Sequence, residues 1–260
     1  MKQLMLVKIG GGFITHKARY KTVNQPALEH IAKEIAQFRR EYSTVDLIIG
    51  NGGGSYPHYP AHKHGLNAQH WQPISDKLAF GVAETHHHAQ LINSLTVEML
   101  QAEGVSALAF SPLNILWHTD EKTQLFDLPL RKALESACTP VLYGDMVLGE
   151  NGTKIYSTEQ VLFECLQEFR NQYQKITVVY FTNAEGVLDV HSKVIPELKR
   201  DEAVEVQGVH NHDISRGILG KVDAARQAAD VVDEVRVVGG WQQRALQLIL
   251  AGESVGTRVL

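Results

Sequence analysis

Two short apolar runs within the first fifty residues each end directly in a glycine-rich turn. Residues 4–9 lead into Gly10-Gly11-Gly12, and residues 45–49 lead into residues 50–55, which contain four glycines. Continuous apolar runs of this length are typical of strands buried in a parallel sheet. In open parallel sheets, ligands gather beyond the carboxyl ends of the strands. The pattern therefore predicts an α/β fold with a binding site where the two turns meet.

The rest of the chain alternates strand-like apolar runs with amphipathic helical stretches, as βαβ units do. We expect helices over residues 76–102, 158–169, 218–229 and 242–250, a hairpin over residues 146–156, and an edge strand over residues 255–259. Together these elements predict a three-layer αβα, doubly wound fold with a mostly parallel sheet. Two functional lobes, residues 1–150 and 151–260, would share that continuous fold.

Composition and charge argue against several classes of protein. The chain has 260 residues and a formal net charge of −4, which does not predict a surface that coats nucleic acid. We find no apolar run near the roughly 20 residues needed to span a bilayer, and the apolar N-terminal run is too short for a secretory signal. We therefore expect a cytoplasmic protein whose two cysteines stay reduced.

Lysines accompany the glycine turns. Lys8 is the penultimate residue of the first apolar run, Lys17 follows in the same connection, and Lys221 comes just after Gly217 and Gly220. Neither turn fits the P-loop or the dinucleotide-binding pattern. Singly, each lysine is compatible with a solvated surface charge. Their common placement indicates phosphoryl transfer, which needs positive charge around the moving group and Mg²⁺ on the ATP phosphates.

These residues resemble the amino acid kinase superfamily. Within it, Ile14-Thr15-His16-Lys17 and Gly52-Gly53-Gly54-Ser55-Tyr56-Pro57-His58 are similar to elements of isopentenyl phosphate kinases and of their relative fosfomycin kinase. The resemblance runs in order over nearly the whole chain. The loop that ends in His58 is its most specific part, because kinases for free carboxylates generally lack that histidine.

The resemblance implies a role for each matching position. Lys8 and Lys17 would act on the transferred phosphoryl group as catalytic residues together with His58. The acceptor would lie in the first lobe, held by Gly53, Gly54, His58 and Gly144. The nucleotide would be held by Lys8, Gly10, Gly11, Gly12, Gly54, Asn183, Gly186, Gly217 and Lys221. The implied cofactors are ATP and Mg²⁺, and the implied assembly is a homodimer through the first lobe.

A phosphate acceptor suits this set of residues. A phosphate monoester has a second pKa near 6, so its oxygen is already an anionic nucleophile at neutral pH. Such an acceptor needs positive charge and backbone N–H groups rather than a general base. We accordingly expect no catalytic carboxylate beside the glycine turns.

The chain departs from the related kinases in the second lobe. They usually carry Thr-Asp-x-Asp-Gly where this chain has residues 182–186, and Ser-Gly-Asp-Asp where it has Ser157-Thr158-Glu159-Gln160. Their Asp-Val-Thr-Gly-Gly-like element corresponds to residues 213–217. These differences bear on the contacts to ATP and on the rate of catalysis.

The chain contains thirteen histidines, but their spacing does not predict a metal site. Residues 86–88 are consecutive on a helix, where side chains point in different directions and cannot share one ion. No cysteine or carboxylate accompanies the other histidines at zinc-ligand spacing, so we expect no metal held by the protein itself. Apolar residues between positions 74 and 117 fit an isoprenoid tail and ordinary core packing equally well.

Three hypotheses follow for the function. The first is phosphorylation of isopentenyl phosphate to isopentenyl diphosphate. The second keeps the chemistry and replaces the acceptor with a phosphonate or another small phosphomonoester. The third is a nucleotide-binding regulatory protein with reduced catalysis. Partners are expected to be small phosphorylated molecules, with no nucleic acid and no membrane.

Overall fold

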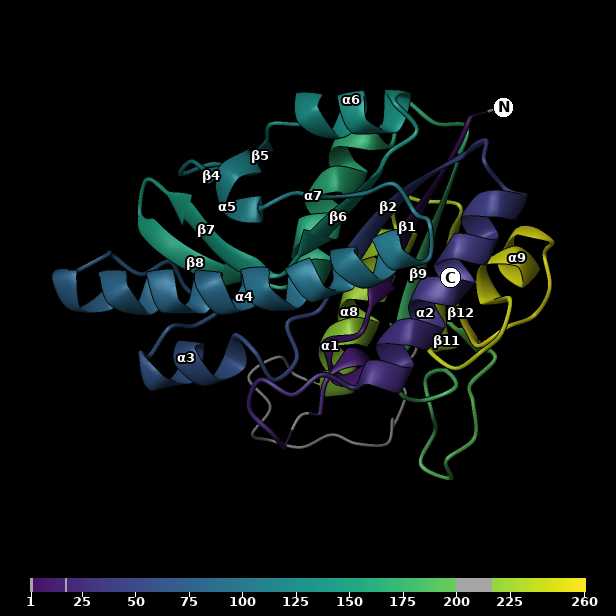
Figure 1. The fold of residues 1–260 in the computed structure, drawn as a ribbon, viewed down its shortest axis with the longest axis horizontal. Helices are drawn as coiled ribbons and strands as arrows, with labels where there is room; N and C mark the ends of the chain where they lie inside the picture. The colour runs from purple at the N-terminus through teal and green to yellow at the C-terminus, as the bar shows by residue number, and fades with distance from the viewer. Residues whose placement is uncertain (1, 17, 200–216) are drawn as a thin grey trace.

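A computed structural model describes residues 2–16, 18–199 and 217–260 of the chain. Its main sheet has the strand order β10-β12-β11-β9-β1-β2-β6-β3 (Figure 1). These strands are β1 (Gln3–Ile9), β2 (Val45–Asn51), β3 (Ala107–Ala109), β6 (Thr139–Tyr143), β9 (Lys175–Thr182), β10 (Glu197–Leu198), β11 (Glu234–Gly239) and β12 (Thr257–Val259). All neighbouring pairs are parallel except β11 with β12.

Helices cover both faces of this sheet. They are α1 (Gly11–Ile14), α2 (Gln25–Glu41), α3 (His58–Lys63), α4 (Asp76–Ala102), α5 (Pro112–Ile115), α6 (Leu128–Glu135), α7 (Thr158–Phe169), α8 (Gly217–Ala229) and α9 (Ala245–Leu250). One apolar core joins the sheet to α2, α4 and α9, and a second joins it to α6, α7 and α8. The three-layer αβα arrangement predicted from the sequence is therefore confirmed.

The central strand β1 explains how a lysine reaches the interior. Met5 and Val7 belong to the core under α2 and α4, whereas Leu4 and Leu6 belong to the core under α7. Since side chains alternate between the faces of a strand, Lys8 follows Leu6 toward the α7 side. Its Cα pairs with Gly50 of β2 in a parallel register, so the turns after β1 and β2 emerge at the same edge of the sheet.

A second, smaller sheet is formed by strands between residues 116 and 156. It has the order β5-β4-β7-β8, formed by β4 (Leu116–His118), β5 (Thr123–Leu125), β7 (Asp145–Gly149) and β8 (Gly152–Tyr156). The hairpin expected over residues 146–156 is confirmed as β7 and β8. Residue 150, our lobe boundary, lies in its turn. A small apolar cluster of Ala61, Leu66 and Met146 packs between α3, α4 and β7.

Two sequence-based boundaries need correction. The strand expected at the sheet edge, β12, lies between β11 and β10, because β10 pairs outside it with only two residues and carries no recognisable pattern. The helix expected from residue 242 begins at Ala245, because Arg244 has a left-handed backbone with φ of 54°. Within the described residues, Cys138 and Cys165 are free thiols. No helix there is long and apolar enough to cross a bilayer.

Candidate active site

The two glycine turns pack backbone against backbone. A Cβ atom added to Gly11 would lie 2.4 Å from the Gly54 nitrogen, and one added to Gly52 would lie 2.5 Å from the Gly11 nitrogen. The Thr15 hydroxyl ties the turns together, since it donates to the Gly11 carbonyl at 2.8 Å and accepts from the Ser55 N–H at 3.0 Å. Only glycine allows this approach, so the turns form one structural unit.

That unit presents free hydrogen-bond donors. In the described part of the chain, the N–H groups of Gly12, Gly53 and Gly54 donate to no protein acceptor. Gly54 has a left-handed backbone with φ of 55°. Successive backbone N–H groups in such turns make a concave site that binds anions. We call the two turns together, residues 10–12 and 52–55, the glycine cradle.

Lys8 lies beside the cradle and is paired with a carboxylate. The Lys8 side chain is almost fully buried, and its ammonium donates to Glu159 Oε1 at 2.7 Å. Glu159 is the second residue of α7. A buried ammonium is costly unless it is paired, so the contact with Glu159 fixes the position of the Lys8 side chain.

A second lysine belongs to the same charge cluster. Burial by itself would raise the pKa of the Glu159 carboxyl, but the neighbouring Lys8 ammonium and its hydrogen bond, together with the charge of Lys221, hold that pKa below its usual value. Lys221 lies in the first turns of α8. Glu159 therefore senses the charges of both Lys8 and Lys221, two residues that the sequence predicted for the site.

The N-terminus of α7 is fixed to the ends of the neighbouring strands. Ser157 and Gln160 form a capping box at the start of the helix. The Thr158 hydroxyl donates to the Asn51 carbonyl at the end of β2, at 2.9 Å. A Cβ atom on Gly144 would lie 3.0 Å from the Thr158 nitrogen. Gly144 therefore lies where β2, β6 and α7 converge, at the same edge of the sheet as the cradle.

The predicted nucleotide residues of the second lobe separate into two groups. The Asn183 amide donates to the Gly12 carbonyl at 2.8 Å, and the Gly10 N–H donates to the Phe181 carbonyl at 3.0 Å. The loop after β9 therefore borders the cradle. Gly186 instead packs against β12, since a Cβ there would lie 2.8 Å from Thr257 Oγ1. Its contact with the nucleotide stays a prediction.

Of the remaining predicted site residues, the structure describes some and not others. His58 is the exposed first residue of α3, and Gly217 is the first residue of α8. Lys17 and the element at residues 213–216 lie outside the described residues. The catalytic roles predicted for Lys17 and His58 therefore stay predictions.

Glu159 is the site residue that the sequence analysis missed. We expected no catalytic carboxylate beside the turns, and Glu159 is a carboxylate that lies there, bound to a lysine rather than open to a substrate proton. One signal was present. The acid at the third position of Ser-Gly-Asp-Asp in the related kinases matches Glu159 in this chain. No group of three or more potential metal ligands exists among the described residues.

An open, mostly parallel sheet whose strand ends carry a glycine cradle and a buried lysine–carboxylate pair defines a phosphotransferase of the α/β class. The sequence model of the amino acid kinase family matches residues 3–239. The chain belongs to the amino acid kinase family.

Its relatives include kinases with a named acceptor. The isopentenyl phosphate kinase of Methanothermobacter thermautotrophicus is 26% identical over 270 residues, covering 98% of each chain. That of Haloferax volcanii is 27% identical over 261 residues, covering 98% of this chain and 97% of the relative. A crystal structure of an isopentenyl phosphate kinase substrate complex has a TM-score of 0.78 at 18% identity, covering 98% of this chain and all of the other. That last likeness concerns the fold.

Proposed function

We propose that this protein transfers the γ-phosphoryl group of ATP to isopentenyl phosphate, giving isopentenyl diphosphate and ADP. The observation that carries the proposal is the glycine cradle with the Lys8–Glu159 pair beside it, in a chain whose full-length relatives are named isopentenyl phosphate kinases. A phosphate oxygen of the acceptor attacks the γ-phosphorus, and the bond from that phosphorus to the bridging oxygen of ADP breaks.

One set of residues binds the phosphates of ATP, and another binds the phosphate of the acceptor. Lys8, Lys17 and Lys221 neutralise the transferred group and the nucleotide, while the cradle N–H groups hold phosphate oxygens. His58, with Gly53 and Gly144, binds the phosphate of the acceptor. Mg²⁺ enters with the nucleotide, since this ion is usually bound through substrate phosphates and water. Residues 1–150 then form the acceptor lobe and residues 151–260 the nucleotide lobe, and the reaction takes place in the cytoplasm.

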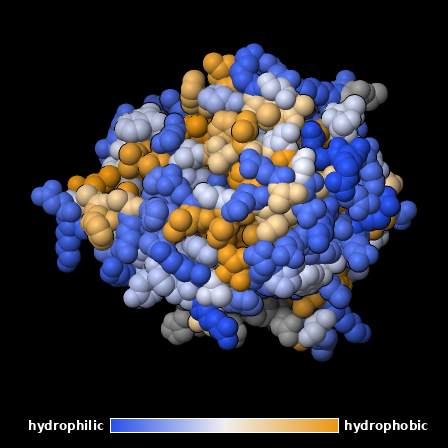
Figure 2. All heavy atoms as spheres, in the orientation of Figure 1, coloured by the Kyte–Doolittle hydropathy of each residue, from blue (hydrophilic) through white to orange (hydrophobic). Residues whose placement is uncertain are grey.

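We also infer a homodimer through the first lobe. Leu95 on α4 and Leu108 on the edge strand β3 are 36% and 43% exposed. Figure 2 shows hydrophobic residues gathered near the middle of the face on which α4 lies. Covering such a surface with a second copy removes it from water. Light scattering tests this, with an expected mass twice the 28.9 kDa of one chain.

One assay tests the proposed reaction against its alternatives. Purified protein is incubated with MgATP and, separately, isopentenyl phosphate, dimethylallyl phosphate, fosfomycin or simple amino acids, and ADP release is measured. We expect the highest kcat/KM with isopentenyl phosphate. Preference for fosfomycin would indicate a phosphonate kinase, and ATP binding without turnover would indicate a regulatory protein. Turnover of amino acids alone would contradict any phosphate acceptor.

A further inference from the structure

A buried histidine–aspartate pair lies beside Gly144, outside the residues assigned so far. The Asp145 carboxylate is fully shielded from solvent and accepts from His86 Nδ1–H at 2.8 Å. The Met146 N–H and the Ser111 hydroxyl complete its shell at 2.8 and 3.4 Å. Because Asp145 immediately follows Gly144, His86 is held at the edge of the region where we place the acceptor.

The helix α4 carries this histidine along the ends of two strands. His86, Gln90 and Asn93 are spaced i, i+4 and i+7, which puts them on one side of a helix. Gln90 hydrogen-bonds the Tyr143 hydroxyl at the end of β6. The Asn93 amide donates to Asn51 Oδ1 at the end of β2, at 2.8 Å. These three residues of α4 therefore follow the end of β6, next to Gly144, and the end of β2, which leads into the cradle.

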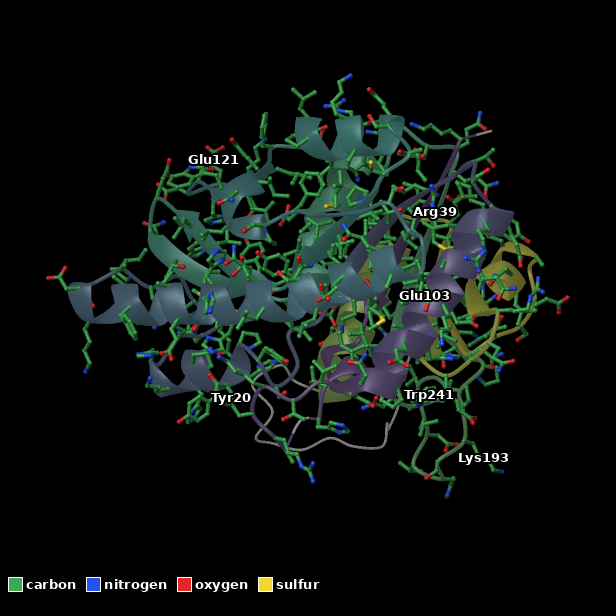
Figure 3. The ribbon with its side chains drawn as sticks, in the orientation of Figure 1. Tyr20, Arg39, Glu103, Glu121, Lys193 and Trp241 are labelled. Carbon is green, nitrogen blue, oxygen red and sulfur yellow. The ribbon has the colours of Figure 1, made fainter. Side chains whose placement is uncertain are left out.

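The helix α3 brings its first residue toward the same turn of α4. At the C-terminal end of α3, His64 Nε2 lies 2.6 Å from Glu84 Oε2. Near its N-terminal end, the Tyr59 ring lies 4.7 Å from the ring of Tyr20, whose hydroxyl is 2.8 Å from His88 Nε2 (Figure 3 labels Tyr20). The two helices therefore run antiparallel, and α3 packs against the side of α4 that carries Glu84 and His88. His86 is two residues from each of them, roughly 200° around the helix, so it faces β7 from the other side of α4. His58, the residue before Tyr59, lies near the same level of α4 but on the α3 side.

The free edge of the His86 ring is available to a ligand. Its Nδ1 is engaged by Asp145, and within the described residues no protein group accepts from Nε2, which is not a buried atom. The preceding residue, Thr85, is 2% exposed and its hydroxyl has no hydrogen-bond partner. The Asp145 hydrogen bond raises the pKa of His86 against the opposing effect of burial, which favours the imidazolium and hence an anionic ligand.

We propose that His86, positioned by Asp145, is a second histidine for the acceptor phosphate, donating from Nε2–H to one of its oxygens from the β7 side while His58 binds another from the α3 side. This rests on the proposed function and deepens it. A hydrocarbon tail has no acceptor for the Nε2–H of His86, and covering that donor without a partner is costly. A phosphate dianion offers a charge-assisted hydrogen bond that His86 alone, among the residues 86–88, is placed to make.

The test is His86→Gln with His87→Gln as its matched control. His87 is an exposed neighbour on the same helix. We expect His86→Gln to raise the KM for isopentenyl phosphate roughly 10- to 100-fold, the range for a hydrogen bond to a charged group, with the ATP KM unchanged. His87→Gln should change neither. Asp145→Asn should mimic His86→Gln in part, since the amide still holds the ring without its charge.

Calorimetric binding separates this inference from the proposed reaction. Isopentenyl phosphate and inorganic phosphate are titrated into the enzyme without ATP, and circular dichroism verifies that each variant is folded. A similar fold-loss for both probes in His86→Gln supports phosphate recognition. An unchanged affinity for both, or a loss for isopentenyl phosphate alone, overturns it, because the histidine would then be structural or would contact the tail. If the wild type phosphorylates isopentenyl phosphate but His86→Gln changes nothing, the proposed reaction is supported and the role of His86 is contradicted. If His86→Gln weakens phosphate binding but the wild type shows no turnover, the role of His86 is supported and the proposed reaction is contradicted.

Discussion

At the scale of single residues, the surroundings of Glu159 separate two roles that a carboxylate beside a lysine can have. A general base must take up a proton near neutral pH, so its pKa needs to lie near the working pH. The Lys8 and Lys221 charges instead hold the pKa of Glu159 low, against the effect of its burial. Glu159 therefore holds Lys8 in place, and the nucleophile is the anionic oxygen of the acceptor.

Replacing Glu159 should therefore misplace Lys8 rather than remove a base. We expect Glu159→Gln to lower kcat by up to roughly 100-fold, the cost of a misplaced catalytic group. It should also lower the free energy of unfolding by up to about 3 kcal/mol, because a buried ammonium loses its partner. Steady-state kinetics and urea unfolding measure both effects. Glu168→Gln, at an exposed position of the same helix, should leave both unchanged.

The same pair predicts a pH dependence of stability. Because the pKa of Glu159 is lower in the folded protein, its stabilising effect is present above the ordinary carboxyl pKa of about 4.3 and is lost as pH falls through the lower, folded value. The difference in unfolding free energy between the wild type and Glu159→Gln should stay constant from pH 8 to 6 and decrease progressively as pH falls below about 4. A difference that did not decrease at all between pH 6 and pH 3 would mean that the side chain acts by shape rather than charge.

His58 and Lys17 should affect different kinetic constants. A residue that contacts only the acceptor changes the acceptor KM, whereas one that acts on the transition state changes kcat. We expect His58→Ala to raise the acceptor KM by roughly 10-fold or more with little change in the ATP KM, and Lys17→Met to act mainly on kcat. His62→Ala, at an exposed position of α3, is the control. Equal changes in both KM values would contradict the role given to His58.

At the scale of elements, the cradle depends on the distance between two turns. A Cβ atom on Gly54 would lie 2.0 Å from Thr15 Oγ1 and 2.6 Å from the Gly11 carbonyl oxygen. Such contacts cannot be relieved by a flexible side chain, because one partner is backbone. The turns after β1 and β2 would have to separate, and the N–H groups that they contribute would no longer converge.

A pair of glycine substitutions isolates that effect. Gly65 has a φ of 68°, similar to the 55° of Gly54, but a Cβ there meets nothing within 4 Å. Gly65→Ala should therefore cost only the backbone strain of about 1 kcal/mol. Gly54→Ala should cost more and should also raise the ATP KM. Thermal unfolding and kinetics compare the two variants, and equal effects would show that backbone conformation alone explains Gly54.

Elements with a clear period were predictable, and pairings between distant elements were not. The helices at residues 76–102 and 158–169 match α4 and α7, because a capping serine precedes each of them. The cradle followed from glycines placed directly after apolar strands. Glu159 and His86 escaped prediction because their roles arise from contacts 151 and 59 residues away in sequence. The strand β10 escaped because two residues carry no period.

At the scale of the whole molecule, a chain with net charge −4 must bind two polyanions. It does so by collecting positive charge and backbone donors at one edge of one sheet, from Lys8 of β1, the turns of the glycine cradle and Lys221 of α8, with the Glu159 carboxylate of α7 beside Lys8. Because elements from the beginning and the end of the chain meet at that edge, a nucleotide bound there should hold the whole fold together. Ligand binding to the native state alone then stabilises the protein by mass action.

MgATP should consequently raise the melting temperature of the entire chain. At 100-fold excess over Kd the stabilisation is about 2.7 kcal/mol, which corresponds to between about 5 and 10 °C for a chain of this size. ATP with EDTA should give a smaller shift, because the lysines alone must then offset the phosphate charge. Lys8→Met should largely remove the shift relative to its own unliganded protein, whereas Lys33→Met, at an exposed position of α2, should retain it. If Lys8→Met and Lys33→Met shifted alike in differential scanning fluorimetry, Lys8 would not contact the nucleotide, and the burial of its ammonium beside Glu159 would serve only the fold.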